Sequence, residues 1–286
     1  FYSADFRTHA MGHLMVQMLE SHNKSLFELH GFYFGPPINN QDLLQKRILN
    51  CFDSFNDISN QDDQSVYNLS KKLEIDIAID MMGHTGDNNR FAIFLKKLAP
   101  IQINFLGYPG TSGTKNMDYI VADKVIIPER NQKYCTEKVI YLPDTDQANE
   151  DIKKISDKNF TKDMFGLPKD KFIFCSFNSN SKINHKTFSL WMSILSKAKD
   201  SVLWIMSDNN EAKNNLKNFA LKSGIDVKRL VFANLMPLDE HLKRLQFGDL
   251  ILDTFPYNAH TTCSDALRVN VPVLTLKGEG FASRVA

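Results

Sequence analysis

The most constraining feature of this sequence is the alternation of short apolar runs with longer amphipathic segments. Runs such as residues 75–80 and 101–106 are typical of buried parallel strands. Residues 10–20 carry apolar side chains at helical spacing, which is typical of a helix packed on a sheet. Strands that alternate with helices favour a parallel sheet, so the sequence predicts an α/β fold.

The alternation occurs in two series separated by a polar segment. We predict elements of the first series at residues 1–3, 10–20, 26–34, 43–49, 66–73, 75–80 and 91–98, continuing at 101–106, 117–122 and 138–142. We predict elements of the second series at residues 172–177, 185–197, 201–206, 210–222, 230–233, 238–247, 250–252 and 271–276. We therefore expect an N-terminal Rossmann-like lobe over 1–143, a linker over 144–170 and a C-terminal Rossmann-like lobe over 171–286, facing each other across a cleft.

Composition excludes several classes of protein. The net charge of +1 argues against a nucleic-acid or membrane partner, and no apolar run reaches transmembrane length. The four cysteines form no CxxC pair, which favours reduced cysteines in a cytoplasmic protein. The chain starts with Phe1 and ends in what looks like the start of a helix, so we expect a fragment of a longer protein.

Several cofactor motifs are missing or poorly placed. No GxGxxG follows a strand and no GxxxxGK[ST] occurs, which disfavours dinucleotide and P-loop sites. Asp144 and Asp146 form a DxD pattern that holds a divalent metal in many sugar-nucleotide enzymes. Because they lie in a charged linker, we predict no metal site there.

Residues 249–267 form a strand, a loop and a helix N-terminus. We expect Thr261 or Thr262 to be the N-cap, with His260 beside it and Asp265 one turn further in. Free backbone N–H groups and the helix dipole make such an end an anion site, although an ordinary capped helix is the alternative interpretation.

Two further side chains lie at strand ends of the second series. Lys182 follows the strand at 172–177, and His241 lies in the first turn of the helix after Pro237. Each alone is compatible with an ordinary surface residue. Together with the helix N-terminus they predict a phosphorylated nucleotide, with its base on His241 and its diphosphate near Lys182.

The first series carries three candidates of its own. His9 lies where the first strand turns into a helix, at the strand end where α/β sheets bind ligands. Residues 81–86 form a glycine-containing turn after a strand, which is equally compatible with a plain turn. Residues 106–113 hold three glycines and a proline after another strand, so we expect a binding loop.

Five motifs resemble one known family. They are Ser3-Ala-Asp-Phe-Arg-Thr-His9, Leu106-Gly-Tyr-Pro-Gly-Thr-Ser-Gly113, Met117-Asp-Tyr119, Asn258-Ala-His-Thr-Thr262 and Ala282-Ser-Arg-Val-Ala286. In this order they resemble the catalytic region of the protein O-GlcNAc transferase family, in its bacterial SPINDLY-like members of glycosyltransferase family 41. The resemblance covers nearly the whole chain.

The resemblance implies a GT-B fold and a function. It implies an inverting, metal-independent enzyme that moves N-acetylglucosamine from UDP-GlcNAc to Ser or Thr of a protein acceptor. It implies no cofactor besides this donor, tetratricopeptide (TPR) repeats ahead of the catalytic region, and a cytoplasmic location. One alternative is a related enzyme that uses another UDP-hexose or glycosylates Asn. The other is a non-catalytic sugar-nucleotide-binding scaffold.

The resemblance also assigns roles to residues of this chain. It implies that Lys182 neutralises the diphosphate, that Thr261 and Thr262 bind it beside His260, and that Asp265 holds the ribose while His241 stacks on uracil. His9 matches a residue proposed as base or acceptor-orienting group. The sugar-side loop comprises Leu106, Gly107, Tyr108, Pro109, Gly110 and Thr111.

Three positions depart from the family pattern. Ser181 replaces a tyrosine, and Ser179 and Leu238 replace the glutamine and lysine of animal members. These departures put the nucleotide affinity and the choice of sugar in question.

Overall fold

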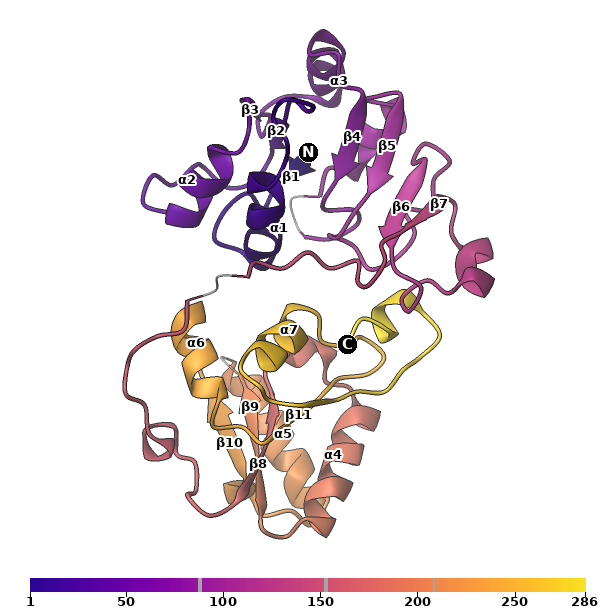
Figure 1. Ribbon diagram of the computed structural model, residues 1–286. Helices are drawn as coiled ribbons and strands as arrows, with labels where there is room; N and C mark the ends of the chain where they lie inside the picture. The colour runs from indigo at the N-terminus through magenta and orange to yellow at the C-terminus, as the bar shows by residue number, and fades with distance from the viewer. Residues whose placement is uncertain (87–88, 152–153, 208) are drawn as a thin grey trace. The chain divides into compact units, whose positions relative to one another are not determined.

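The computed structural model describes residues 1–86, 89–151, 154–207 and 209–286 (Figure 1). It divides into two compact units, Phe1–Ile152 (unit 1) and Lys153–Ala286 (unit 2). The boundary falls inside the segment 144–170 that we expect as a linker. Each unit is built on one parallel sheet, which confirms the predicted α/β class.

Unit 1 has a seven-stranded sheet in the order β3-β2-β1-β4-β5-β6-β7. Its elements are β1 (Tyr2–Ser3), α1 (Ala10–Glu20), β2 (His30–Tyr33), α2 (Leu43–Leu49), β3 (Ser54–Asp57), α3 (Asp63–Lys72), β4 (Ile77–Asp80), the 3₁₀ helix η1 (Phe91–Lys96), β5 (Ile101–Asn104), β6 (Tyr119–Ala122), the 3₁₀ helix η2 (Glu129–Tyr134) and β7 (Lys138–Tyr141). The strand order reverses between β1 and β4, and ligands of such sheets bind at the carboxyl ends of strands at this point.

The helices of unit 1 cover both faces of its sheet. Helix α1 buries Leu14 and Met15 in one apolar cluster, which Ile48 of α2 joins. Helix α3 and η1 contribute Val66 and Phe94 to the other cluster. The apolar spacing of residues 10–20 therefore marks the buried face of α1, as predicted.

Unit 2 has a five-stranded sheet in the order β10-β9-β8-β11-β12. Its elements are η3 (Lys162–Phe165), β8 (Phe172–Ser176), η4 (Asn180–Lys182), α4 (His185–Lys197), β9 (Ser201–Met206), α5 (Asn210–Lys222), η5 (Val227–Arg229), β10 (Leu230–Ala233), α6 (Leu238–Leu245), β11 (Leu250–Leu252), α7 (Thr261–Arg268), β12 (Val273–Leu274) and η6 (Phe281–Ser283).

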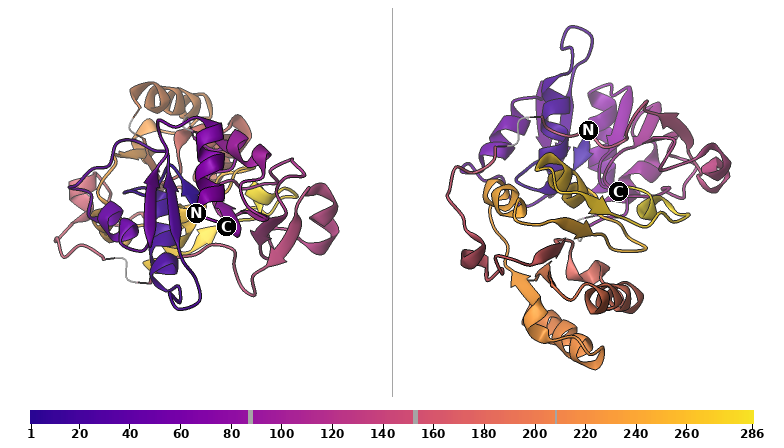
Figure 2. Two further views of the ribbon diagram at one scale, coloured as in Figure 1. Left: turned by 90° about the horizontal axis from the view of Figure 1, so that it is seen from above. Right: turned by 60° about the horizontal axis from the view of Figure 1, so that its bottom comes forward.

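Helices α4 and α5 pack on one face of this sheet, and α6 and α7 pack on the other (Figures 1 and 2). Helix α4 shows why these helices pack on the sheet. Its apolar residues recur at helical spacing and form one buried face: Phe188, Trp191, Met192 and Leu195. Strands β8 and β11 are neighbours, so η4 and the loop after β11 lie at the same edge of the sheet.

The structure differs from the predictions at two places. The helix expected over residues 91–98 is present as a shorter 3₁₀ helix, η1, which ends where Lys97 adopts the left-handed conformation. Strand β3 was not predicted, because its residues Ser54–Asp57 are mostly polar and lie at the edge of the sheet.

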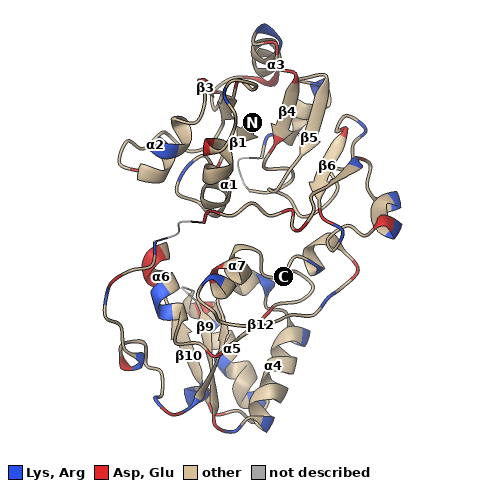
Figure 3. Ribbon diagram, in the orientation of Figure 1, with Lys and Arg blue, Asp and Glu red and all other residues tan. Residues whose placement is uncertain are grey.

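Charge is dispersed over both units (Figure 3). Helix α6 carries Asp239 and Glu240 in its first turn and Lys243 and Arg244 in its last, which complements the helix dipole. Among the described residues, no helix combines the length and apolar character needed to cross a membrane.

Candidate nucleotide-binding and acceptor-side residues

The loop between β11 and α7 is organised by the buried carboxylate of Asp253. One of its oxygens accepts hydrogen bonds from the backbone N–H groups of Thr254 and Ala259, both at 2.7 Å, and from Nδ2 of Asn178 at 3.3 Å. The other accepts a hydrogen bond from Oγ1 of Thr275 at 2.6 Å. Sequence analysis missed Asp253, although an aspartate directly after a buried strand and before a turn was a usable signal.

Helix α7 begins at Thr261, and His260 occupies the N-cap position without a side-chain capping bond. The prediction that Thr261 or Thr262 is the N-cap is therefore wrong. The reason is that the hydroxyl of Thr262 donates a hydrogen bond to Oδ1 of Asn178 at 2.9 Å. Among the described residues, no acceptor contacts the backbone N–H groups of Thr261 and Thr262, so they are available to an anion.

Lys182 lies beside this helix end. Its Nζ donates a hydrogen bond to the backbone oxygen of Asn258 at 2.9 Å and lies 4.3 Å from the ring centroid of Tyr257. Burial lowers the pKa of Lys182 to about 8, although the charge of Asp253 opposes this shift. Lys182 is therefore mainly protonated at neutral pH. The negative charge of Asp253 only partly offsets the cost of burying the ammonium group of Lys182.

His260 completes this group. Its ring stacks on Tyr257 with centroids 5.1 Å apart, and its Nε2 is buried without a hydrogen-bond partner among the described residues. Burial, followed by the charge of Lys182, lowers the pKa of His260 to about 4. The neutral ring can therefore offer a hydrogen bond to a ligand at neutral pH. The structure thus brings Lys182, His260, Thr261 and Thr262 together.

His241 lies on α6, with its ring edge against Phe177 at a centroid distance of 5.0 Å. Its Nδ1 accepts a hydrogen bond from Nε of Arg244 at 3.1 Å, which leaves Nε2 as the protonated nitrogen of the neutral ring. Burial and the charge of Arg244 lower the pKa of His241 to about 4, while Asp265 opposes them. Asp265 of α7 is thus close enough to act on His241.

Arg244 is a second residue that sequence analysis missed. It is buried, lies over the ring of Phe177 at 5.1 Å, and donates a hydrogen bond from Nη1 to the backbone oxygen of Asn234 at 2.7 Å. It fixes the tautomer and orientation of His241. Because it follows His241 by one helical turn, its spacing was a possible signal.

The three residues that depart from the family pattern contact only neutral or apolar groups in the interactions described next. The hydroxyls of Ser179 and Ser181 are 2.9 Å apart and hydrogen-bonded to each other in the exposed segment around η4. Leu238 packs against the apolar cluster beneath α6. A lysine at that position would offer a charge that this chain does not have.

In unit 1, His9 caps the N-terminus of α1. Its Nδ1 lies 3.2 Å from the backbone N–H nitrogen of Met11, which it caps, and 3.3 Å from Oδ2 of Asp5. Burial lowers the pKa of His9, whereas the charge of Asp5 raises it and that of Arg7 lowers it further. Asp5 is thus a carboxylate neighbour of the His9 ring that the sequence alone did not show.

The loop over residues 106–113 packs closely on the turn that follows β4. A Cβ on Gly107 would lie 2.1 Å from the backbone oxygen of Met81, and one on Gly83 would lie 2.5 Å from Cβ of Tyr108. The glycines are therefore required by close approach of the two segments. Both segments follow strands at the carboxyl edge of the sheet, and a binding role for the loop over residues 106–113 stays a prediction.

Asp80 holds that turn, and sequence analysis assigned it no role. Its Oδ1 accepts hydrogen bonds from the backbone N–H groups of Met82 at 2.9 Å and Gly83 at 3.0 Å. Burial raises its pKa to about 6, although these bonds oppose the shift.

Within the described ranges, no group of three or more His, Cys, Asp or Glu side chains could hold a metal ion. Asp146 of the DxD pattern is buried, and its backbone N–H donates a hydrogen bond to Oδ2 of Asp123 at 3.1 Å. The side chain of Asp146 therefore belongs to the interior of unit 1.

A model of Glycosyl transferase family 41 matches residues 1–155 and 148–286. The chain belongs to this family. The match spans the whole chain, as the resemblance of the five motifs led us to expect. The predicted membership of glycosyltransferase family 41 is therefore confirmed.

Curated relatives bear names that agree with this family. An Arabidopsis thaliana protein named "Probable UDP-N-acetylglucosamine--peptide N-acetylglucosaminyltransferase SEC" is 32% identical over 100% of this chain and 30% of its own length. A Caenorhabditis elegans protein named "UDP-N-acetylglucosamine--peptide N-acetylglucosaminyltransferase" is 26% identical over 100% of this chain and 34% of its own. The chain thus spans about a third of these family members.

Solved structures agree as well. A mutant of the Thermobaculum terrenum O-GlcNAc transferase superposes with a TM-score of 0.88 at 26% identity, covering 99% of this chain and 53% of that one. A Rickettsia africae glycosyltransferase shares the fold alone, with a TM-score of 0.58 at 12% identity, covering 96% of this chain and 76% of that one. The predicted GT-B fold of this family 41 chain is confirmed.

Proposed function

We propose that the protein carrying this chain transfers N-acetylglucosamine from UDP-GlcNAc to Ser or Thr hydroxyls of a protein acceptor. The observation that carries the proposal is the group around the start of α7, where Lys182, the unpartnered Nε2 of His260 and two free backbone N–H groups lie together. Membership of family 41 supports a nucleotide-sugar diphosphate as the anion that binds there.

The leaving UDP gains negative charge as the bond to the sugar breaks. Lys182 offers a positive charge, and the N–H groups of Thr261 and Thr262 offer hydrogen bonds along the helix dipole. These groups are fixed before the reaction, so they need not reorganise as charge develops. Asp265 would hold the ribose, and His241 would stack on uracil with its neutral ring fixed by Arg244.

The acceptor hydroxyl must lose its proton during the displacement. We assign His9 as the group that takes it, because its lowered pKa keeps the imidazole neutral at physiological pH. Nε2 can take the proton when the ring's own proton lies on Nδ1 facing Asp5, which replaces the hydrogen bond from Met11. Attack on the anomeric carbon from the side opposite UDP inverts its configuration. The positive charge of Lys182 and the dipole at the start of α7 would offset the negative charge of the diphosphate, so the reaction would need no metal ion. The TPR repeats and the cytoplasmic location stay predictions.

The test is a donor panel with mass spectrometry. The protein is incubated with UDP-GlcNAc or UDP-glucose and a peptide library that contains Ser, Thr or Asn acceptors. We expect an N-acetylhexosamine mass increment on Ser or Thr, with the anomeric coupling of the product showing inversion. A hexose increment, or one on Asn, would instead favour the related enzyme. UDP binding without any transfer would favour the scaffold.

A further inference from the structure

The sugar-side residues 106–111 belong to the loop between β5 and β6, and the middle of this longer loop is held by a carboxylate from a distant part of unit 1. Oε1 of Glu137 accepts a hydrogen bond from the backbone N–H of Ser112 at 2.6 Å. Its Oε2 accepts hydrogen bonds from Oγ1 of Thr111 at 2.6 Å and from Oγ1 of Thr136 at 3.0 Å. Glu137 directly precedes β7 and is only 5% exposed, so its bond with the backbone of Ser112 is shielded from water.

The carboxylate of Glu137 is charged in this environment. Burial acts to raise its pKa, but hydrogen bonds from Ser112 and Thr111 outweigh burial and hold the pKa below its usual value. No Lys or Arg of the described residues pairs with it, so loop groups supply its stabilisation. Hydrogen bonds to an ionised acceptor are about twice as strong as neutral ones, which makes the contact a firm anchor.

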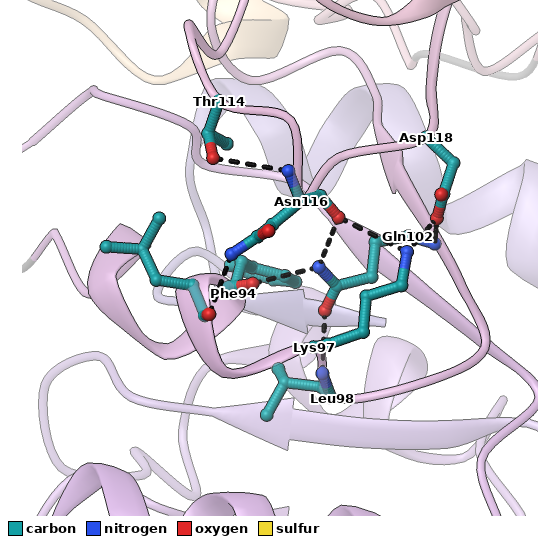
Figure 4. Close-up of polar contacts among 8 residues, drawn as sticks. Phe94, Lys97, Leu98, Gln102, Thr114, Asn116 and Asp118 are labelled. Atoms are coloured by element: carbon teal, nitrogen blue, oxygen red, sulfur yellow. Dashed lines mark hydrogen bonds and ion pairs between the residues drawn. The ribbon is translucent and has the colours of Figure 1, made fainter.

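The two ends of the loop have anchors of their own. At the upstream end, Gly107 packs on Met81 in the turn that Asp80 holds. At the downstream end, the buried Gln102 donates a hydrogen bond from Nε2 to the backbone oxygen of Asn116 at 2.8 Å (Figure 4). These anchors do not depend on Glu137.

Between these ends the loop also makes contacts with neutral partners. Oγ1 of Thr111 accepts a hydrogen bond from the backbone N–H of Thr136 at 3.1 Å. Nδ2 of Asn104 donates a hydrogen bond to the backbone oxygen of Gly110 at 3.1 Å, and Nε2 of His84 lies 2.9 Å from the backbone oxygen of Ser112. Glu137 alone among these residues contributes three accepted bonds and a charge. The conformation of Thr111 and Ser112 therefore depends mainly on Glu137.

We propose that Glu137 is a positioning residue that holds the sugar-side loop in the geometry needed for transfer. The inference rests on the proposed function, because that function gives the loop its role. Glu137 acts through Thr111 and Ser112. Small displacements of a group that positions a substrate lower the reaction rate by large factors. Removing the side chain of Glu137 should therefore lower turnover.

The experiment compares Glu137→Ala and Glu137→Gln with Glu129→Ala in the full protein. Glu129 is a matched control, because it is an exposed glutamate of the same region whose partner is Lys124 at 3.6 Å. Deuterium exchange over residues 106–113 reports the anchor itself. We expect Glu137→Ala to accelerate exchange at Ser112 by about 10-fold or more, and the control to leave it unchanged.

Turnover and UDP affinity complete the test. We expect Glu137→Ala to lower kcat by about 10- to 100-fold while the Kd for UDP stays within about twofold. Glu137→Gln should be intermediate, because its carbonyl oxygen can still accept from Ser112 but carries no charge.

Unchanged exchange in Glu137→Ala would overturn the anchor. Loss of UDP affinity in step with thermal unfolding would also overturn the proposal, because it would show a merely structural role. A wild-type protein with no turnover would refute the proposed function instead, and the exchange data would still decide whether Glu137 holds the loop.

Discussion

Nζ of Lys182 donates a hydrogen bond to the backbone oxygen of Asn258 at 2.9 Å. This bond ties η4, which follows β8, to the loop that leads into α7. A lysine whose fixed partner is a carbonyl oxygen keeps its positive charge available to a ligand. The same bond places that charge beside the first free N–H groups of α7.

Replacing Lys182 removes the charge that we assign to the diphosphate. We expect Lys182→Ala to weaken UDP binding by about 10-fold or more, because a charge-assisted contact contributes roughly 1.5–3 kcal/mol. Calorimetric titration with UDP measures this. Lys186→Ala is the control, because Lys186 is an exposed lysine in the first turn of α4. Equal affinity in both variants would contradict the assignment.

UDP affinity should depend on pH through Lys182. Its pKa of about 8 in the free protein is lower than its ordinary value, and a bound diphosphate raises it again. Binding therefore takes up a proton above pH 8, so the affinity for UDP should fall as the pH rises above about 8. His260, with a pKa near 4, stays neutral in this window. Affinity that rises above pH 8 would contradict the account.

The Asp253 carboxylate should matter for stability as well as binding. Asp253→Asn leaves donors that faced a charged acceptor without an equivalent partner, so we expect a loss of about 3 kcal/mol in the free energy of unfolding. Thr275→Val removes one of these hydrogen bonds and should cost about 1 kcal/mol. Urea unfolding followed by circular dichroism gives both values. Equal losses in the two variants would argue against a central role for Asp253.

Asp5 should set the pH dependence of turnover through His9. The charge of Asp5 raises the pKa of His9, so Asp5→Asn should lower that pKa. A base works in its neutral form, so the acidic limb of the kcat profile should move to lower pH in this variant. His9→Ala should lower kcat across the whole profile. An unmoved acidic limb in Asp5→Asn, or full activity in His9→Ala, would remove His9 as the base.

Most helices and strands could be predicted from the spacing of apolar residues along the sequence. The bounds predicted for α1, α4 and α5 coincide with those of the structure. Helices α1 and α4 each bury an apolar stripe, and α5 places Leu216, Phe219 and Ala220 against the sheet. Strand β3 was missed because Ser54–Asp57 lacks an apolar run. The helix expected over 91–98 is present as η1, but apolar spacing alone did not show that it is a 3₁₀ helix.

The candidate site was predictable only in part. Lys182, His260 and Thr261 could be placed together, because strand ends of one parallel sheet meet at the same edge. Partners from distant positions could not be foreseen. Asn178 reaches Asp253 across 75 residues, and Glu137 reaches Ser112 across 25. The error at the N-cap has the same origin, because Asn178 engages the hydroxyl of Thr262.

The most direct test compares sugar transfer by the wild-type protein and Lys182→Ala under identical conditions. Both are incubated with UDP-GlcNAc and the peptide library, and intact masses are recorded alongside circular dichroism spectra. The account predicts an N-acetylhexosamine increment with the wild type and none with the folded Lys182→Ala variant. Transfer at the wild-type rate by that variant, or a wild type that binds UDP but transfers nothing, would contradict it.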